Sequence, residues 1–120
     1  MTTKTLTKED LAQFTGTEQW YRHPLMRKVL FTDGVKYVAD TAGAYWLIDL
    51  IAFSQVEPAV TAEEFQVWKL AVAADCSAVV TCEDGNSNQV MKQNLEFTDF
   101  PLDEISFYFT DNVILLPREY

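Results

Sequence analysis

The sequence has few of the residues that make tight turns, cross-links and metal sites: four glycines, four prolines, two cysteines and one histidine. So few glycines form no loop of the kind that cradles phosphate groups. Cys76 and Cys82 are too few for a disulfide scaffold, and we expect both to be free thiols in a reducing compartment. With His23 they supply at most three soft ligands, at a spacing unusual for zinc. We therefore expect no metal site and no cofactor.

Long hydrophobic runs are also missing. The longest, residues 42–53, is interrupted by Asp49 and falls short of the roughly 20 apolar residues that span a bilayer. The first ten residues, MTTKTLTKED, contain neither an apolar run nor a small-residue cleavage site. We expect a cytoplasmic protein with no membrane partner.

Positive charge is scarce after residue 40. Residues 1–40 carry six Lys/Arg against five Asp/Glu, whereas residues 41–120 carry three against thirteen, so the two parts have net charges of +1 and −10. Because nucleic-acid binding depends on cations that neutralise phosphates, direct DNA or RNA binding is disfavoured.

The acidic charge favours a protein partner with a basic surface, because a negative field speeds encounter with a positive cleft. Carboxylates along strands and turns could imitate phosphates in such a cleft. The alternative is that this charge only keeps the protein soluble. The candidate partner-binding residues are Glu57, Glu63, Glu64, Glu83, Asp84, Glu96, Asp99, Asp103, Glu104 and Asp111.

The length and composition predict one domain over residues 1–120. Hydrophobic residues make up 48% of the chain and aromatic residues 13%, enough for a packed core. We predict an α+β fold: an antiparallel sheet of about five to seven strands, a short N-terminal helix over residues 8–14 and a buried central helix over residues 43–54, packed on the sheet.

Turn chemistry and β-branched runs predict the strands. Asp33-Gly34, between residues 28–32 and 35–38, is typical of a tight hairpin turn. We expect further strands over residues 65–72, 77–82, 90–97, 105–110 and 113–116, with a turn at Asp111-Asn112. Thr61 and Glu64 also fit a capping box, so a helix could start there instead.

Residues 41–52, TAGAYWLIDLIA, predict a helix that is apolar on nearly every side. Such a helix should be buried all round, with the sheet on one side and a second layer or a second subunit on the other. A homodimer is one outcome, and Trp46, Asp49, Leu50 and Phe53 are the candidate oligomer or partner face. Asp49 either anchors a partner or a ligand cation, or marks the most solvated edge of the helix, or pairs with Arg22, Arg27 or a tyrosine hydroxyl.

We expect no enzymatic activity. The alternative is a small hydrolase or transferase that uses His23 with Glu18, Asp33 or Asp40, which would require these side chains to share a pocket. The oxygen-rich segment 83–88 lacks the carboxylate pattern of a calcium loop, and we expect a turn there.

Five stretches resemble a family of small uncharacterised proteins of bacteria, phages and plasmids, a domain of unknown function: Leu11-x-x-Phe14-x-Gly16-Thr17-Glu18, Tyr21-Arg22-His23-Pro24, Thr32-Asp33-Gly34-Val35-x-Tyr37, Ala42-Gly43-Ala44-Tyr45-Trp46-Leu47-x-Asp49 and Phe97-Thr98-Asp99-Phe100-Pro101-Leu102. The resemblance spans most of the chain and implies no catalytic residues. It implies an accessory role in mobile genetic elements, including inhibition of a host nucleic-acid-handling or defence complex such as CRISPR or restriction.

Overall fold

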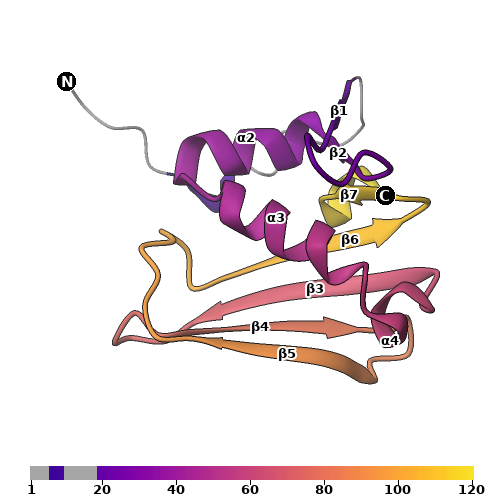
Figure 1. The fold of residues 1–120 in the computed structure, drawn as a ribbon. Helices are drawn as coiled ribbons and strands as arrows, with labels where there is room; N and C mark the ends of the chain where they lie inside the picture. The colour runs from indigo at the N-terminus through magenta and orange to yellow at the C-terminus, as the bar shows by residue number, and fades with distance from the viewer. Residues whose placement is uncertain (1–5, 10–18) are drawn as a thin grey trace.

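The computed structural model describes residues 6–9 and 19–120, which form an α+β fold around one seven-stranded sheet (Figure 1). The strand order is β1-β2-β7-β6-β3-β4-β5. The strands are β1 Trp20–Arg22, β2 Leu30–Thr32, β3 Phe65–Val72, β4 Ala78–Glu83, β5 Gln89–Leu95, β6 Glu104–Thr110 and β7 Val113–Leu115. The predicted fold class is therefore confirmed at the level of α+β, and the strand number falls within the predicted range.

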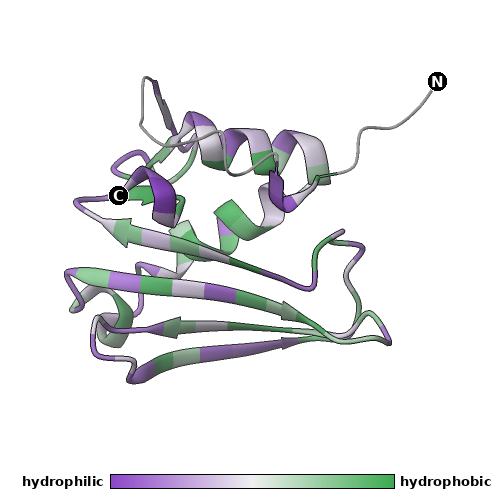
Figure 2. Cartoon of the chain, turned by 180° about the vertical axis from the view of Figure 1, so that it is seen from behind, coloured by the Kyte–Doolittle hydropathy of each residue, from purple (hydrophilic) through white to green (hydrophobic). Residues whose placement is uncertain are grey.

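Strands β3 to β7 form where the sequence predicts them, within two residues at each end. Their side chains alternate between the core and the other face of the sheet, as for Gln66, Trp68 and Leu70 on the core side of β3. Figure 2 shows hydrophobic and hydrophilic residues along β3, but hydropathy does not separate its two faces, since polar Gln66 lies on the core side and apolar Phe65 on the other. Asp111 and Asn112 have positive φ angles of 53° and 64°, so the predicted two-residue turn joins β6 to β7.

The predicted hairpin at Asp33-Gly34 is wrong. These residues begin helix α2, Asp33–Ala42, and residues 35–38 belong to that helix. Thr32 caps it by accepting a hydrogen bond from the amide of Val35 at 3.2 Å. Val35, Val38 and Ala39 are buried at helical spacing, and Gly43 ends the helix with a φ of 64°. The threonine cap and the 3–4 residue period outweigh the turn propensity of Asp-Gly.

The sheet is mixed rather than wholly antiparallel. Without the predicted hairpin partner, β2 pairs antiparallel with β1 and parallel with β7, through Leu30 opposite Val113 and Phe31 opposite Ile114. The parallel pair follows from α2, because the chain leaves β2 into a helix instead of turning back beside it.

The central helix is α3, Tyr45–Ser54, which starts two residues later than predicted because Gly43 ends α2. Its inner side buries Leu47, Ile48, Ile51 and Ala52, and Figure 1 shows α3 crossing in front of β6. The described part of the chain leaves its outer side partly exposed, so these residues do not form the second layer expected there, and cover by a second subunit stays a prediction. There, Tyr45 and Phe53 are more than two-fifths exposed.

Two other helical predictions concern shorter segments. Most of the predicted helix 8–14 lies outside the described residues. The alternative helix starting at Thr61 does not form, because a four-residue helix, α4 Pro58–Thr61, ends there and β3 begins at Phe65. None of the helices in the described ranges is long and apolar enough to cross a membrane.

Candidate functional site

His23 is buried directly after β1, and both of its ring nitrogens are engaged. Nε2 lies 2.7 Å from Asp49 Oδ1, and Nδ1 accepts the backbone N–H groups of Leu25 at 3.1 Å and Met26 at 2.9 Å. The ring packs edge-on against Phe53, with centroids 5.4 Å apart. Because Nδ1 accepts two hydrogen bonds, it carries no proton, and Nε2 donates to Asp49. Through these hydrogen bonds, His23 connects residues 23–26 to α3.

The carboxylates proposed to act with His23 lie elsewhere. Asp33 accepts from the amide of Gly34 at 3.0 Å at the start of α2. Asp40 pairs with Lys36 at 2.6 Å and accepts a hydrogen bond from the Tyr45 hydroxyl, and these contacts lower the pKa of Asp40. Glu18 is outside the described residues. The histidine therefore meets one carboxylate, Asp49, which the sequence analysis had assigned to other partners.

The predicted partner face on α3 is exposed over part of its surface. Asp49 and Phe53 are exposed, whereas Trp46 and Leu50 are only partly so and pack against the core. Two exposed apolar side chains from outside the helix extend this face: Leu25, whose amide is held by His23, and Val56, which follows α3. We call Trp46, Asp49, Leu50 and Phe53, with Leu25 and Val56, the α3 face.

The ten predicted partner-binding carboxylates divide between two ends of the sheet. Glu57, Glu63, Glu64, Glu83, Asp84 and Asp111 lie at the end where β3 begins and β4 and β6 finish, which we call the acidic end. Glu96, Asp99, Asp103 and Glu104 lie at the far end, where β5 finishes and β6 begins. At about 3.3 Å per residue, the eight residues of β3 separate the two groups by about 23 Å.

Charges at the acidic end are close enough to affect a neighbouring thiol. Burial raises the pKa of Cys82 to about 12, and the negative charges of Glu63, Glu83 and Asp84 add to the effect. Cys82 is therefore a buried thiol rather than a reactive one. Both cysteines are free, as predicted, and the described residues contain no group of His, Cys, Asp and Glu suited to a metal ion.

Two of the six carboxylates serve internal contacts. Asp84 organises the predicted turn by accepting the amides of Asn86 at 2.8 Å and Asn88 at 2.9 Å, and these bonds lower its pKa. Glu83 lies 3.3 Å from Lys69 Nζ. Among the described residues, the side chains of Glu57, Glu63, Glu64 and Asp111 form no hydrogen bond or ion pair, which leaves them available to a partner.

Three of these available carboxylates surround a polar hollow of about 390 Å³. We call it the acidic hollow, and it is lined by Gln55, Thr61, Glu63, Glu64, Gln66, Phe109, Thr110, Asp111 and Asn112. Buried Gln66 fixes the adjoining core. Its Oε1 accepts from Gln55 at 2.8 Å and from the Trp68 indole at 2.9 Å, and its Nε2 donates to the Val60 carbonyl at 2.9 Å. The hollow therefore lies beside a buried amide network and is lined by exposed Glu64 and Asp111 and by partly exposed Glu63.

Glu119 is a half-buried acid that the sequence analysis missed. It follows β7 in a single 3-10 turn, η1 Pro117–Glu119, and reaches the start of α2. Its carboxylate accepts from the Thr32 hydroxyl at 2.6 Å, the Leu116 amide at 2.9 Å and the Gly34 amide at 3.3 Å. A side chain on Gly34 would meet this carboxylate at 2.8 Å. No local pattern links Glu119 to Thr32, because 87 residues separate them.

Comparison with known proteins gives a family and no activity. The chain matches, over residues 5–120, a family of unknown function, DUF6876. No curated protein and no solved structure matches it. The resemblance to a domain of unknown function is therefore confirmed, whereas the distribution among bacteria, phages and plasmids stays a prediction.

Proposed function

Since the chain belongs to the family of unknown function DUF6876, its relatives assign it no activity, and we propose that it is a non-enzymatic protein that binds a basic surface of another protein through its acidic end. The observation that supports this most is the acidic hollow, which joins Glu63, Glu64 and Asp111 from two separate segments of the chain. A concave site with several unpaired carboxylates suits the guanidinium group of an arginine, which carries five N–H donors.

The acidic end acts separately from the acids at the far end. The two groups are about 23 Å apart, more than twice the screening length of about 10 Å at 0.1 M salt. A partner at the acidic end therefore responds to charges there and little to those at the far end.

A basic surface is also what a nucleic-acid-handling protein presents. We propose that the target is such a host protein, in keeping with an accessory role in a mobile element and inhibition of a defence complex. Two free cysteines suit a reducing cytoplasm as the place of action. The hydrolase or transferase alternative gains no support from His23, whose ring nitrogens already hold Asp49 and two backbone amides.

The test uses a fluorescein-labelled nona-arginine peptide as a basic probe, with binding followed by anisotropy. Glu64→Lys with Asp111→Asn changes the charge by +3, and asparagine tolerates the positive φ at position 111. We expect this variant to bind about tenfold more weakly, because it loses two acidic contacts worth up to about 1 kcal/mol each.

The matched control is Glu96→Lys with Asp99→Asn, which changes the charge equally at the far end. We expect it to bind within about twofold of the original chain, and binding of both should weaken between about 50 and 200 mM salt. Equal weakening by the two variants would show that only net charge matters and would contradict the proposal.

A further inference from the structure

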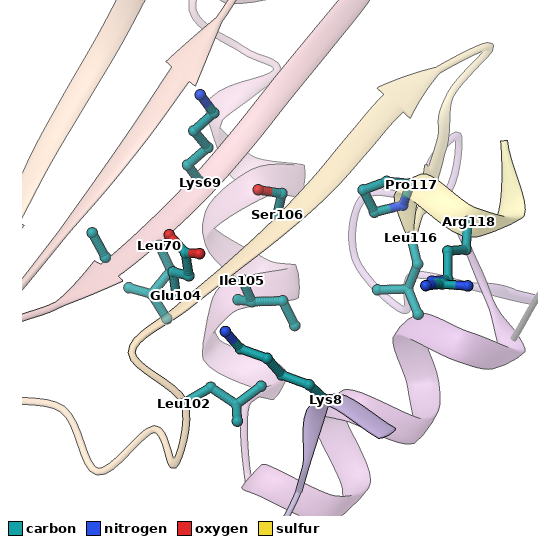
Figure 3. A pocket seen from close by; sticks show the side chains of 11 residues that line it. Lys8, Lys69, Leu70, Leu102, Glu104, Ile105, Ser106, Leu116, Pro117 and Arg118 are labelled. Atoms are coloured by element: carbon teal, nitrogen blue, oxygen red, sulfur yellow. The ribbon is translucent and has the colours of Figure 1, made fainter. Parts of the chain in front are cut away.

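A second hollow, of about 680 Å³, lies beside the first half of β6 and gathers positive charge (Figure 3). Lys8, Lys69 and Arg118 line it, with Glu104 as the one acid in its lining. Residues 41–120 contain only three Lys/Arg, and two of them, Lys69 and Arg118, are here. Its other walls are largely apolar, as Figure 3 shows for Leu102 and Ile105 on one side and Leu116 on the other. We call this hollow the cationic groove.

The groove lies where a strand is missing from the sheet. β7 pairs with β6 only from Tyr108 to Thr110, opposite Leu115 to Val113. Pro117 lacks a backbone N–H and starts η1, so the chain turns away from β6 at that point. Among the described residues, Glu104–Phe107 therefore pair with β3 on one side and with no strand on the other.

The alternation of an antiparallel ladder shows which backbone groups face the groove. Thr110 and Val113 flank a two-residue turn, so they form a hydrogen-bonded pair, as do Tyr108 and Leu115 two residues further on. By the same alternation, Ser106 and Glu104 direct their backbone N–H and C=O groups toward the groove. Both residues line it, and in the described ranges neither has a backbone hydrogen bond on that side.

From this combination, we propose that the cationic groove binds a short extended segment of a partner protein, with alternating apolar and acidic side chains, as an added strand on β6. The unpaired backbone groups of Ser106 and Glu104 supply main-chain hydrogen bonds, as in other cases of strand addition to a sheet edge. The segment continues the line of β7 that Pro117 interrupts. This site is separate from the acidic end and does not depend on the function proposed there.

The side-chain preferences follow from the two faces of the sheet. Side chains opposite one another on neighbouring strands lie on the same face. A residue opposite Ile105 faces the apolar walls, whereas a residue opposite Ser106 shares the face of Lys69, the cross-strand neighbour of Ser106. Lys8 and Arg118 form no ion pair with a described residue, and Lys69 lies 3.3 Å from Glu83. Acidic side chains of the segment therefore fit the sheet face that carries Lys69, and apolar side chains fit the face that carries Ile105.

The probe is the peptide acetyl-Val-Asp-Val-Asp-Val-amide, because valine favours extended backbone. We expect saturable binding in calorimetry and slower hydrogen exchange at the amide of Ser106 when the peptide is bound. The same peptide with lysine in place of aspartate, or with N-methylated aspartates whose backbone nitrogens can no longer donate to β6, should bind at least about fivefold more weakly.

Variants of the protein test the charges. Arg118→Glu should weaken binding of the aspartate peptide about fivefold, and Glu104→Gln should strengthen it. Lys92→Glu is the matched control: it reverses a charge on the same sheet face, one strand beyond β4 and outside the groove, and should leave the affinity unchanged.

Equal affinity of the N-methylated and unmodified peptides would overturn strand addition. Failure of the aspartate peptide to bind would overturn the proposal as a whole. Binding of a small amphipathic anion such as octanoate without binding of the peptide would also overturn it, in favour of a small-molecule site. None of these outcomes affects the acidic end, because Arg118 and Ser106 lie outside the acidic hollow.

Discussion

His23 shows how one buried polar side chain can join two separate parts of the chain. Its Nδ1 holds the amides of Leu25 and Met26, and its Nε2 holds Asp49 on α3. A buried donor that loses its acceptor costs about 1–3 kcal/mol, in addition to the cavity left by a deleted side chain. His23 therefore holds the segment after β1 against α3 and contributes to the free energy of unfolding.

At the residue scale, we predict that His23→Ala lowers the free energy of unfolding by about 2–4 kcal/mol, because two amides lose their acceptor and a cavity forms. His23→Asn should cost less, since the Oδ1 of asparagine can take the place of Nδ1 as acceptor. Urea denaturation followed by tryptophan fluorescence measures both. Equal losses for the two variants would show that ring packing on Phe53, rather than hydrogen bonding, dominates.

At the element scale, helix α2 and the turn η1 depend on each other. Glu119 of η1 accepts hydrogen bonds from Thr32 and Gly34 at the start of α2, and the absence of a side chain on Gly34 makes room for it. A negative charge at a helix start is favourable. Burial nevertheless raises the pKa of Glu119 above its ordinary 4.5, and a hydrogen bond to the nearby Asp33 adds to the increase.

The raised pKa predicts a specific pH dependence. Because folded Glu119 holds its proton more tightly than the unfolded chain does, its contribution to stability falls as pH rises from 4.5 through the folded pKa. We expect Glu119→Gln, which cannot ionise, to lose less stability than the original chain over this rise. Urea denaturation at several pH values measures the difference.

The exposed Glu96→Gln is the control for this pH experiment and should follow the original chain. If Glu119→Gln and the original chain have parallel stability curves over the rise in pH, the ionisation of Glu119 does not contribute.

At the scale of the whole molecule, the sheet and helix α3 together present three different surfaces. The acidic end carries available carboxylates, the cationic groove carries unpaired backbone groups, and the α3 face exposes apolar side chains. Exposed apolar patches of this kind commonly mark an interface. The α3 face remains the basis for the proposed homodimer, because the described part of the chain provides no layer over Phe53, Leu25 or Val56.

We predict that light scattering at high micromolar concentration gives about twice the 13.7 kDa mass of one chain. Phe53→Glu should return the mass to that of one chain, because a charge at the centre of an apolar interface is costly. Phe97→Glu changes an equally large exposed side chain away from the α3 face and should leave the dimer intact. A monomer mass for the original chain would contradict this prediction.

The sequence alone determined the features that depend on neighbouring residues. Alternating side chains gave β3 and β6, the Asp111-Asn112 pair gave a turn with two positive φ angles, and the apolar stretch that follows Gly43 gave α3. The family resemblance was also present in the sequence. Each of these signals lies within a few residues, where propensity and periodicity act.

Only the tertiary structure decided how distant segments meet. Asp33-Gly34 starts a helix because Thr32 caps it and Glu119, 87 residues after Thr32, reaches its first turn. Asp49 meets His23 rather than an arginine because α3 packs beside the end of β1. Carboxylates that are spread through residues 57–111 separate into two ends because the antiparallel strands carry them back and forth across the sheet. Such contacts depend on packing between elements, which local residue patterns do not encode.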